Sequence, residues 1–349
     1  MIKALVALLV ACIASSPLDA QVRTPPRKAP TATKPAKPPV AEPQAPPVTA
    51  TPRVPTATEP GKTAAKDTVR QASRWRPYGF SAFTAEVFDS NINREREDPT
   101  RANGFVIGGV ARYQSAESRP GFAVAYEAAR HTYTASEQFD RISQNLSVVL
   151  SRRLTKQVTA EAIGEAALKG SSEDRDVGNQ FLFLPRLNYR LDAARRLRAF
   201  GAYRIRRYET NPDRDAANRY VGAELRSDIG RHSRVEVGYR YETNSARSER
   251  RSYVRRTYST GLERSFGRND DLFAELKFRS QRYPRRLVEV DDEDVPRHDY
   301  RLTPTLEWNH RFGAGFSLIA NYNFENRTSN DPDNGYLDHV FALTGRYDW

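Results

Sequence analysis

The stretch Leu337–Trp349, read as LDHVFALTGRYDW, decides the fold. Apolar or aromatic side chains such as Phe341, Leu343 and Tyr347 fall on every second position, and the positions between them carry polar residues such as Arg346. A period of two is typical of a β-strand with one apolar face and one largely polar face.

Thirteen further segments repeat this alternation along the chain. Such runs, separated by polar connections, predict an all-β fold of fourteen strands. The predicted strands are Phe80–Phe88, Gly104–Gln114, Gly121–Thr134, Ile142–Arg153, Val158–Leu168, Gln180–Arg190, Leu197–Tyr208, Arg219–Ile229, Arg234–Glu242, Tyr253–Phe266, Leu272–Arg279, Tyr300–His310, Phe316–Glu325 and Leu337–Trp349.

Short and long connections alternate between these segments. The short ones begin at intervals of 37 to 45 residues, near 116, 154, 191, 229, 267 and 312. The longer, polar ones cover 89–103, 135–141, 169–179, 209–218, 243–252, 280–299 and 326–336. This layout predicts an antiparallel up-and-down barrel that crosses a membrane. Its short turns would face the periplasm and its long loops the cell exterior. A soluble β-sandwich also alternates, but its open edges give no reason for such asymmetry.

Pro185 and Pro304 fall inside predicted strands, so we expect bulges or local breaks there.

Two short motifs resemble known families. Tyr347 and Trp349, aromatic at the last position and two before it, resemble the C-terminal signal of bacterial outer-membrane β-barrels. The resemblance implies that the barrel-insertion machinery reads these two residues, and that outer-membrane lipid and lipopolysaccharide surround residues 78–349. The run Asp89–Asn93 resembles the first-strand exit of porin-like barrels and of the barrel domain of surface lipoprotein assembly modifiers, a fourteen-stranded group.

Composition agrees with a barrel. Hydrophobic residues make up 38% of the 349 residues, and the mean hydropathy of −0.72 is low for a helical membrane protein. Beyond the N-terminus no apolar run approaches the ~20 residues that a spanning helix needs. Strands of a barrel need only about ten residues each, of which alternate ones meet lipid. No motif for a metal, a cofactor or a nucleic acid is present, and the single cysteine, Cys12, lies in the leader.

The N-terminus has a different character. Met1–Ala20 is predicted to be a secretory signal peptide, although the residues up to Cys12 also resemble a lipoprotein box. Residues 21–77 are predicted to be a disordered, Pro-rich linker in the periplasm. Residues 21–70 contain nine Lys and Arg but only three acidic residues. Such a segment is either a semi-rigid spacer or a tail that contacts anionic cell-wall polymer.

Charged faces of the strands are predicted to line the lumen, because an unpaired Arg at the lipid midplane costs about 2–4 kcal/mol. Five lumenal arginines then lie near the external mouth on nearly adjacent strands, and we call them the basic arc: Arg206, Arg240, Arg255, Arg279 and Arg301. They form either an anion-guiding constriction or a salt-bridge lattice with lumenal acids. The candidate acids are Glu236, Glu242, Glu263, Glu275 and Glu307.

These observations predict a porin-like, non-enzymatic channel for diffusion or export of small or anionic solutes or polymers. The alternative is a non-conducting surface or structural barrel whose tail contacts the cell wall. A third reading, an enzyme, rests on His131 with Ser136 nearby as an acyl-transfer pair. The acidic run Asp291–Asp294 is either a solvated loop or a site for Ca²⁺ or lipopolysaccharide.

Overall fold

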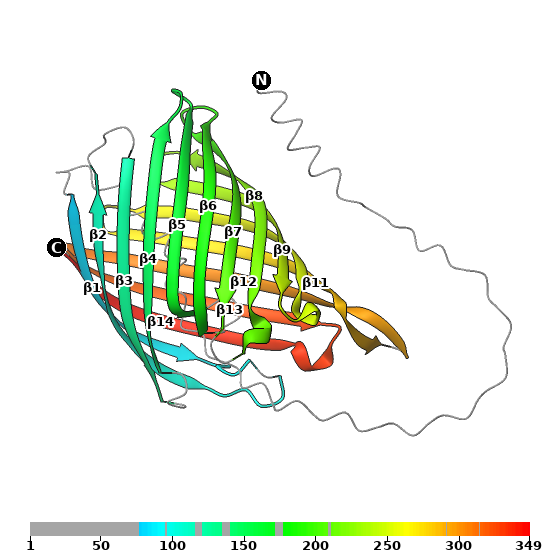
Figure 1. Cartoon of the computed structure of the whole chain (residues 1–349). Coiled ribbons are helices and arrows are strands. Elements are labelled where there is room, and N and C mark those ends of the chain that lie inside the picture. Colours follow the sequence, from blue (N-terminus) through cyan, green and yellow to red (C-terminus); the bar gives the residue numbers. More distant parts are fainter. Residues whose placement is uncertain are drawn as a thin grey trace, which may run out of the picture. The chain divides into compact units, whose positions relative to one another are not determined.

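The protein is a closed barrel of fourteen strands (Figure 1). The computed structural model describes residues 77–94, 96–115, 121–134, 140–171, 177–208, 211–290, 292–313 and 315–349. Each strand pairs antiparallel with its neighbours in the chain, and β1 closes the ring on β14. The strands are β1 Tyr78–Asp89, β2 Ala102–Gln114, β3 Gly121–Tyr133, β4 Arg141–Arg153, β5 Val158–Ser171, β6 Val177–Arg190, β7 Arg195–Arg207, β8 Ala216–Ile229, β9 Ser233–Ala246, β10 Tyr253–Phe266, β11 Asp270–Val290, β12 Glu293–Gly313, β13 Phe316–Ser329 and β14 Tyr336–Asp348. The predicted barrel and its strand number are confirmed.

Two ends of the barrel differ in their connections. The turn end carries the short links β2–β3, β4–β5, β6–β7, β8–β9, β10–β11 and β12–β13. The loop end carries the other links, three of which include the short 3₁₀ helices η2 Pro212–Arg214, η3 Glu249–Arg251 and η4 Pro332–Asn334. β1 begins and β14 finishes at the turn end, where the backbone N–H of Trp349 donates to the carbonyl of Phe80 at 3.0 Å.

In the part of the chain that the structure describes, no helix is long and apolar enough to cross a bilayer. The predicted signal peptide, Cys12 and the predicted linker as far as residue 76 lie outside the described residues.

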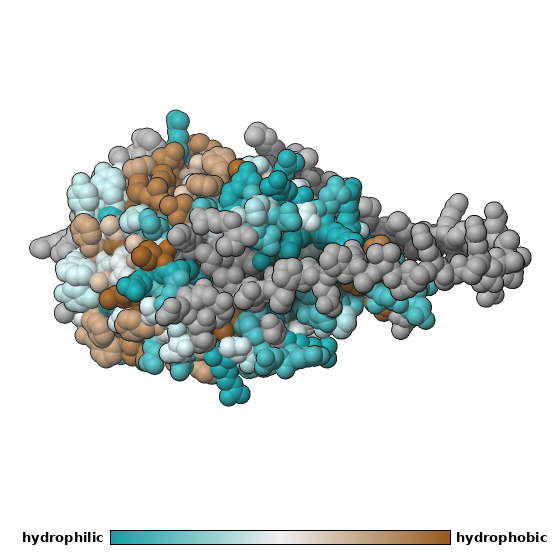
Figure 2. All heavy atoms as spheres, turned by 60° about the horizontal axis from the view of Figure 1, so that its bottom comes forward, coloured by the Kyte–Doolittle hydropathy of each residue, from teal (hydrophilic) through white to brown (hydrophobic). Residues whose placement is uncertain are grey.

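Alternation along each strand separates an apolar exterior from a largely polar interior. In β14 the outward Phe341 and Leu343 are exposed, whereas the inward Val340 and Ala342 are buried. Figure 2 shows hydrophobic residues gathered toward the turn end of one face and hydrophilic residues toward the loop end. An apolar outer band of this kind suits contact with lipid acyl chains.

A row of aromatic rings marks the boundary of the apolar band over β9–β12. The ring centroids of Tyr239 and Tyr258 are 5.2 Å apart, those of Tyr258 and Phe278 are 6.4 Å apart, and those of Phe278 and Tyr300 are 6.0 Å apart. We call these four residues the aromatic row. The outward positions on its loop-end side include the polar Arg256, Arg282 and His298.

Both strand prolines interrupt the ladder on one side only. Pairing of β6 with β7 skips Leu184 and Pro185, and pairing of β12 with β13 skips the positions at Thr303 and Pro304. The register is the same before and after each gap, so these are local breaks rather than bulges. The missing N–H of proline explains them, and the predicted disturbance is confirmed.

The predicted connection 280–299 is wrong. β11 and β12 continue through this region as a paired hairpin, with a register shift between Tyr283 and Leu287. Polar and apolar side chains are mixed here without a regular alternation, so hydrophobic periodicity could not reveal strands that backbone pairing holds together. Of the acidic run, Asp291 lies outside the described residues, Asp292 has a φ of 64° at the tip, and Asp294 pairs with Glu289. Within the described ranges, no three His, Cys, Asp or Glu side chains gather as a metal cluster.

Candidate lumenal charge site

In the turn-end half of the lumen, arginines and acidic residues form ion pairs and are present in nearly equal numbers. Neighbouring strands place each pair side by side, with nitrogen–oxygen distances from 2.5 to 3.4 Å. The pairs are Arg186–Glu161, Arg198–Glu224, Arg226–Glu236, Arg234–Asp228 and Arg234–Glu263. This half of the lumen therefore holds a lattice of salt bridges, which includes the candidate acids Glu236 and Glu263 but no arginine of the basic arc.

Nearer the loop end, one carboxylate is shared by several arginines. Glu242 of β9 lies 3.0 Å from Arg204 and 3.8 Å from Arg206, both on β7. Arg240 on the same strand is 3.6 Å away, and Arg255 on β10 is 3.9 Å away. The Glu242 side chain is 0% exposed. We call these five residues the Glu242 centre, and its formal charge is three positive.

Neutral side chains complete the surroundings of Glu242. The Asn218 side-chain amide donates to its Oε1 at 2.6 Å, and the Tyr253 hydroxyl donates to the same oxygen at 3.1 Å. Arg206 donates to Asn218 at 3.1 Å and to Tyr253 at 2.9 Å. Arg240 lies over the ring of Tyr220, 5.2 Å from its centroid. Hydrogen bonds and ring faces thus hold the guanidinium groups in place around a single acid.

The basic arc divides into two groups. Arg206, Arg240 and Arg255 belong to the Glu242 centre. Arg279 and Arg301 are opposed residues of β11 and β12, and Arg301 lies 3.4 Å from Glu325 of β13. All five side chains face the lumen, as the alternation predicted, and their role in a pore stays a prediction.

Sequence reasoning missed three members of this site: Arg204, Asn218 and Tyr253. Alternation does place Arg204 on the same lumenal face as Arg206, but it does not bring Arg204 to Glu242. Their convergence on one acid depends on the registers of β7 to β10, in which Arg255 is opposite Glu242 and Asn218 is opposite Asn244. No local pattern encodes those registers.

A second acidic centre lies beyond the aromatic row, at the base of the β11–β12 hairpin. Arg297 donates to Asp299 from Nε at 2.9 Å and from Nη2 at 3.0 Å. Ser329 donates to Asp299 at 2.6 Å, and Arg327 also pairs with it. Burial alone would raise the pKa of Asp299, but the charges of Arg327 and Arg297 outweigh it and hold that pKa at about 2. This carboxylate therefore stays ionised and ties the hairpin to β13.

The histidine considered for acyl transfer has a different partner. His131 of β3 is buried and its Nε2 lies 2.8 Å from the Oγ of Ser143 on β4. Ser136 lies outside the described residues. Within the described part of the chain no group hydrogen-bonds His131 Nδ1, so the orienting acid of a catalytic triad is not found there.

The two C-terminal aromatics lie together on the outer wall. Tyr347 and Trp349 meet edge to face with ring centroids 5.0 Å apart, and both are exposed. Their position at the turn end suits an interface with lipid headgroups. Recognition by the insertion machinery stays a prediction.

Comparison with known proteins returns similar solved structures only. No family model matches the chain, and no curated protein matches its sequence. OmpT of Vibrio cholerae is 11% identical with a TM-score of 0.46, over 79% of this chain and 99% of that one. An anion-selective porin from Comamonas acidovorans is 7% identical with a TM-score of 0.47, over 78% and 98%. OpdQ of Pseudomonas aeruginosa is 8% identical with a TM-score of 0.41, over 78% and 97%. Similarity at these values carries no function from one chain to the other. The closed wall and apolar exterior of this chain are themselves the architecture of an outer-membrane β-barrel.

Proposed function

We propose that this chain is an outer-membrane channel whose lumen favours small anionic solutes. The observation that carries the proposal is the imbalance at the Glu242 centre, where four guanidinium groups share one carboxylate. In a low-dielectric wall such an excess attracts anions and repels cations.

A solute in the lumen reaches the positive charge of the centre through its two more exposed arginines. The side chains of Arg204 and Arg240 are 13% and 18% exposed, whereas those of Arg206 and Arg255 are almost completely covered. Arg204 and Arg240 are therefore the groups that a passing anion meets. The covered pair contributes through its field and by holding Glu242.

A second candidate is a non-conducting surface or structural barrel, with the predicted periplasmic tail contacting the cell wall. The burial of Arg206, Glu242 and Arg255 favours it, because side chains fill that part of the lumen. Conductance separates the two candidates.

The test uses the full chain, expressed in a Gram-negative host, purified folded and inserted into a planar bilayer under a KCl gradient. The channel proposal predicts single-channel steps and a reversal potential of the sign that an anion-selective pore gives. Arg240→Gln should reduce that potential. Arg256→Gln is the matched control, because Arg256 carries the same charge at a neighbouring register position but faces outward.

Each outcome decides between the candidates. A folded barrel that never conducts favours the structural role. A cation preference, or equal effects of Arg240→Gln and Arg256→Gln, contradicts an arginine-governed lumen.

A further inference from the structure

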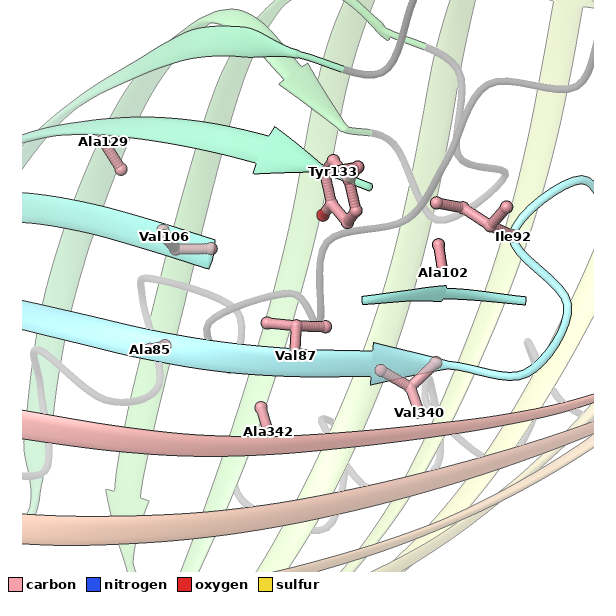
Figure 3. Close-up of a cluster of buried hydrophobic side chains, with 9 residues drawn as sticks. All are labelled: Ala85, Val87, Ile92, Ala102, Val106, Ala129, Tyr133, Val340 and Ala342. Carbon is pink, nitrogen blue, oxygen red and sulfur yellow. The ribbon is translucent and has the colours of Figure 1, made fainter. Parts of the chain in front are cut away.

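The connection between β1 and β2 turns into the barrel instead of leaving it. Its residue Ile92 is 0% exposed. It belongs to a cluster with inward-facing residues of β14, β1, β2 and β3, drawn in Figure 3: Ala85, Val87, Ala102, Val106, Ala129, Tyr133, Val340 and Ala342. Most partners are small, so the wall leaves room for one branched side chain. Burying an isoleucine stabilises this position of the loop, because its apolar surface is removed from water.

Hydrogen bonds fix the base of this loop to β14. The Asn91 side chain donates to the carbonyl of Leu337 at 2.9 Å. The backbone N–H of Ser90 donates to the carbonyl of His339 at 2.9 Å, and the N–H of His339 donates to Ser90 Oγ at 2.8 Å. These bonds join residues about 250 positions apart in the chain, so the loop could not hold this place before the barrel closes.

Bonds within the loop fix its shape as well. The backbone N–H of Ile92 donates to the carbonyl of Thr100 at 2.8 Å. The side chain of Asn93 donates to the carbonyl of Asp98 at 2.7 Å and accepts from the N–H of Thr100 at 2.8 Å. The inward segment is therefore braced from both arms of the loop.

Arg94 follows in a left-handed conformation, with a φ of 56°. That conformation is unfavourable for a non-glycine residue and persists where surrounding contacts dictate it. Here the guanidinium lies 3.1 Å from Glu325 and 5.1 Å from the ring centroid of Tyr336, and its side chain is 8% exposed. Glu325 also pairs with Arg301 and accepts from the Tyr336 hydroxyl.

The position of this loop in the ring gives it significance. Ile92 and Arg94 lie against β13, β14, β1, β2 and β3, whereas the Glu242 centre is built from β7, β9 and β10. In a closed order of fourteen strands, β8 is the strand opposite β1. A passage through the lumen therefore runs between the inward loop on one side and the arginine-rich wall on the other.

We infer that residues 91–94 form a fixed constriction inside the lumen, and that Arg94 is a specificity-determining residue for the anions that pass it. This inference rests on the proposed channel function. It assigns the narrow point to a loop that carries a third positive group, opposite Arg204 and Arg240. Small anions would then meet guanidinium groups from both sides, and large or cationic solutes would be excluded.

The first experiment measures the position of the loop without using conductance. Cys12 is the only cysteine of the sequence, so one cysteine can be introduced at a time into a Cys12→Ala chain. In the folded, detergent-solubilised protein, Ile92→Cys should resist a water-soluble maleimide. Arg96→Cys, on the exposed part of the same loop, should react quickly, and both should react after heat unfolding. Equal rates at the two positions in the folded protein would overturn the inference.

The second experiment measures what the loop does to the pore. Ile92→Asn places an amide in the apolar cluster and should release the loop, so single-channel conductance should rise. Arg94→Gln keeps Ile92 in place and should lower anion preference with little change in conductance. Arg96→Gln removes the same charge from the exposed part of the loop and should change neither.

The outcomes distinguish the constriction from the channel proposal. If the unsubstituted chain does not conduct but Ile92→Asn does, the open channel is contradicted and the loop is supported as the obstruction. If neither conducts, both inferences fail. If the unsubstituted chain conducts and Ile92→Asn leaves its conductance unchanged in a folded barrel, the constriction alone is overturned.

Discussion

Glu242 and Arg255 are opposed residues of β9 and β10, and their side chains meet inside the wall at 3.9 Å with at most 1% exposure each. Three further arginines share the same acid. Removing an acid from such a buried group leaves uncompensated positive charge, whereas removing one member of a more exposed pair costs far less.

Glu242→Gln should lower the stability of the barrel by about 3–5 kcal/mol, the usual cost of breaking a buried ion pair. The measurement is the temperature at which a detergent-solubilised sample loses its compact mobility on a gel. Glu236→Gln is the matched control, because Glu236 lies on the same strand, faces the lumen and pairs with Arg226 at 3.3 Å while 22% exposed. Similar losses for the two variants would contradict a special role for Glu242.

Gly222→Ala should destabilise the barrel by about 1–3 kcal/mol through overpacking. A Cβ at this inward position would lie 2.4 Å from the ring of Phe200 and 2.7 Å from the backbone carbonyl oxygen of Tyr239. The backbone atom belongs to the ladder and cannot move aside. Gly164→Ala on β5 is the control, because nothing lies within 4 Å of its added Cβ. Thermal unfolding of both variants measures the effect, and an unchanged Gly222→Ala would disprove the close approach.

Asp299 should make the stability of the β11–β12 hairpin depend on acid pH. Its pKa of about 2 lies below the ordinary value for an aspartate, so the ionised form stabilises the folded state. That contribution is present above the unfolded pKa of about 4 and is lost as the pH falls through about 2. The shift corresponds to about 2 kcal/mol. Amide hydrogen exchange of the hairpin in the unsubstituted chain and in Asp299→Asn should therefore differ at pH 6 and converge near pH 2.

A matched aspartate tests that pH dependence. Asp213 of η2 is exposed, so Asp213→Asn should leave exchange of the hairpin unchanged at both pH values. A difference between the unsubstituted chain and Asp299→Asn that stays constant down to pH 2 would show that Asp299 acts through packing instead of charge.

Trp349→Ala should reduce the amount of folded barrel in the outer-membrane fraction of expressing cells. Trp349 is exposed at the end of the chain and contacts Tyr347, so its loss removes part of the predicted insertion signal with little loss of packing. Trp308→Ala on β12 serves as the control, since Trp308 is also an outward tryptophan. Equal assembly of Trp349→Ala and the unsubstituted chain would argue against a terminal signal.

The sequence by itself determined the barrel. A period of two is a local property, because successive side chains of a strand leave on opposite sides whatever the strand pairs with. Phe341 outside, Ala342 inside and the lumenal direction of Arg240 and Arg255 therefore follow from counting residues. The alternation of short and long connections then determined the order and direction of the strands. Pro185 and Pro304 predicted the positions at which the strand pairing is interrupted.

Only the tertiary structure decided which lumenal residues meet. Glu242 gathers arginines from three strands because of the registers of β7 to β10, and a register depends on non-local pairing that no short pattern encodes. Ile92 and Arg94 lie inside the barrel because ring closure brings β13 and β14 beside β1, β2 and β3, which together provide the apolar cluster and Glu325. The hairpin of β11 and β12 beyond Tyr283 is held by backbone pairing between segments whose side chains show no regular hydrophobic alternation. The local alternation of side chains thus determined the strands of the barrel wall. Contacts between residues distant in the chain determined which side chains meet in the lumen.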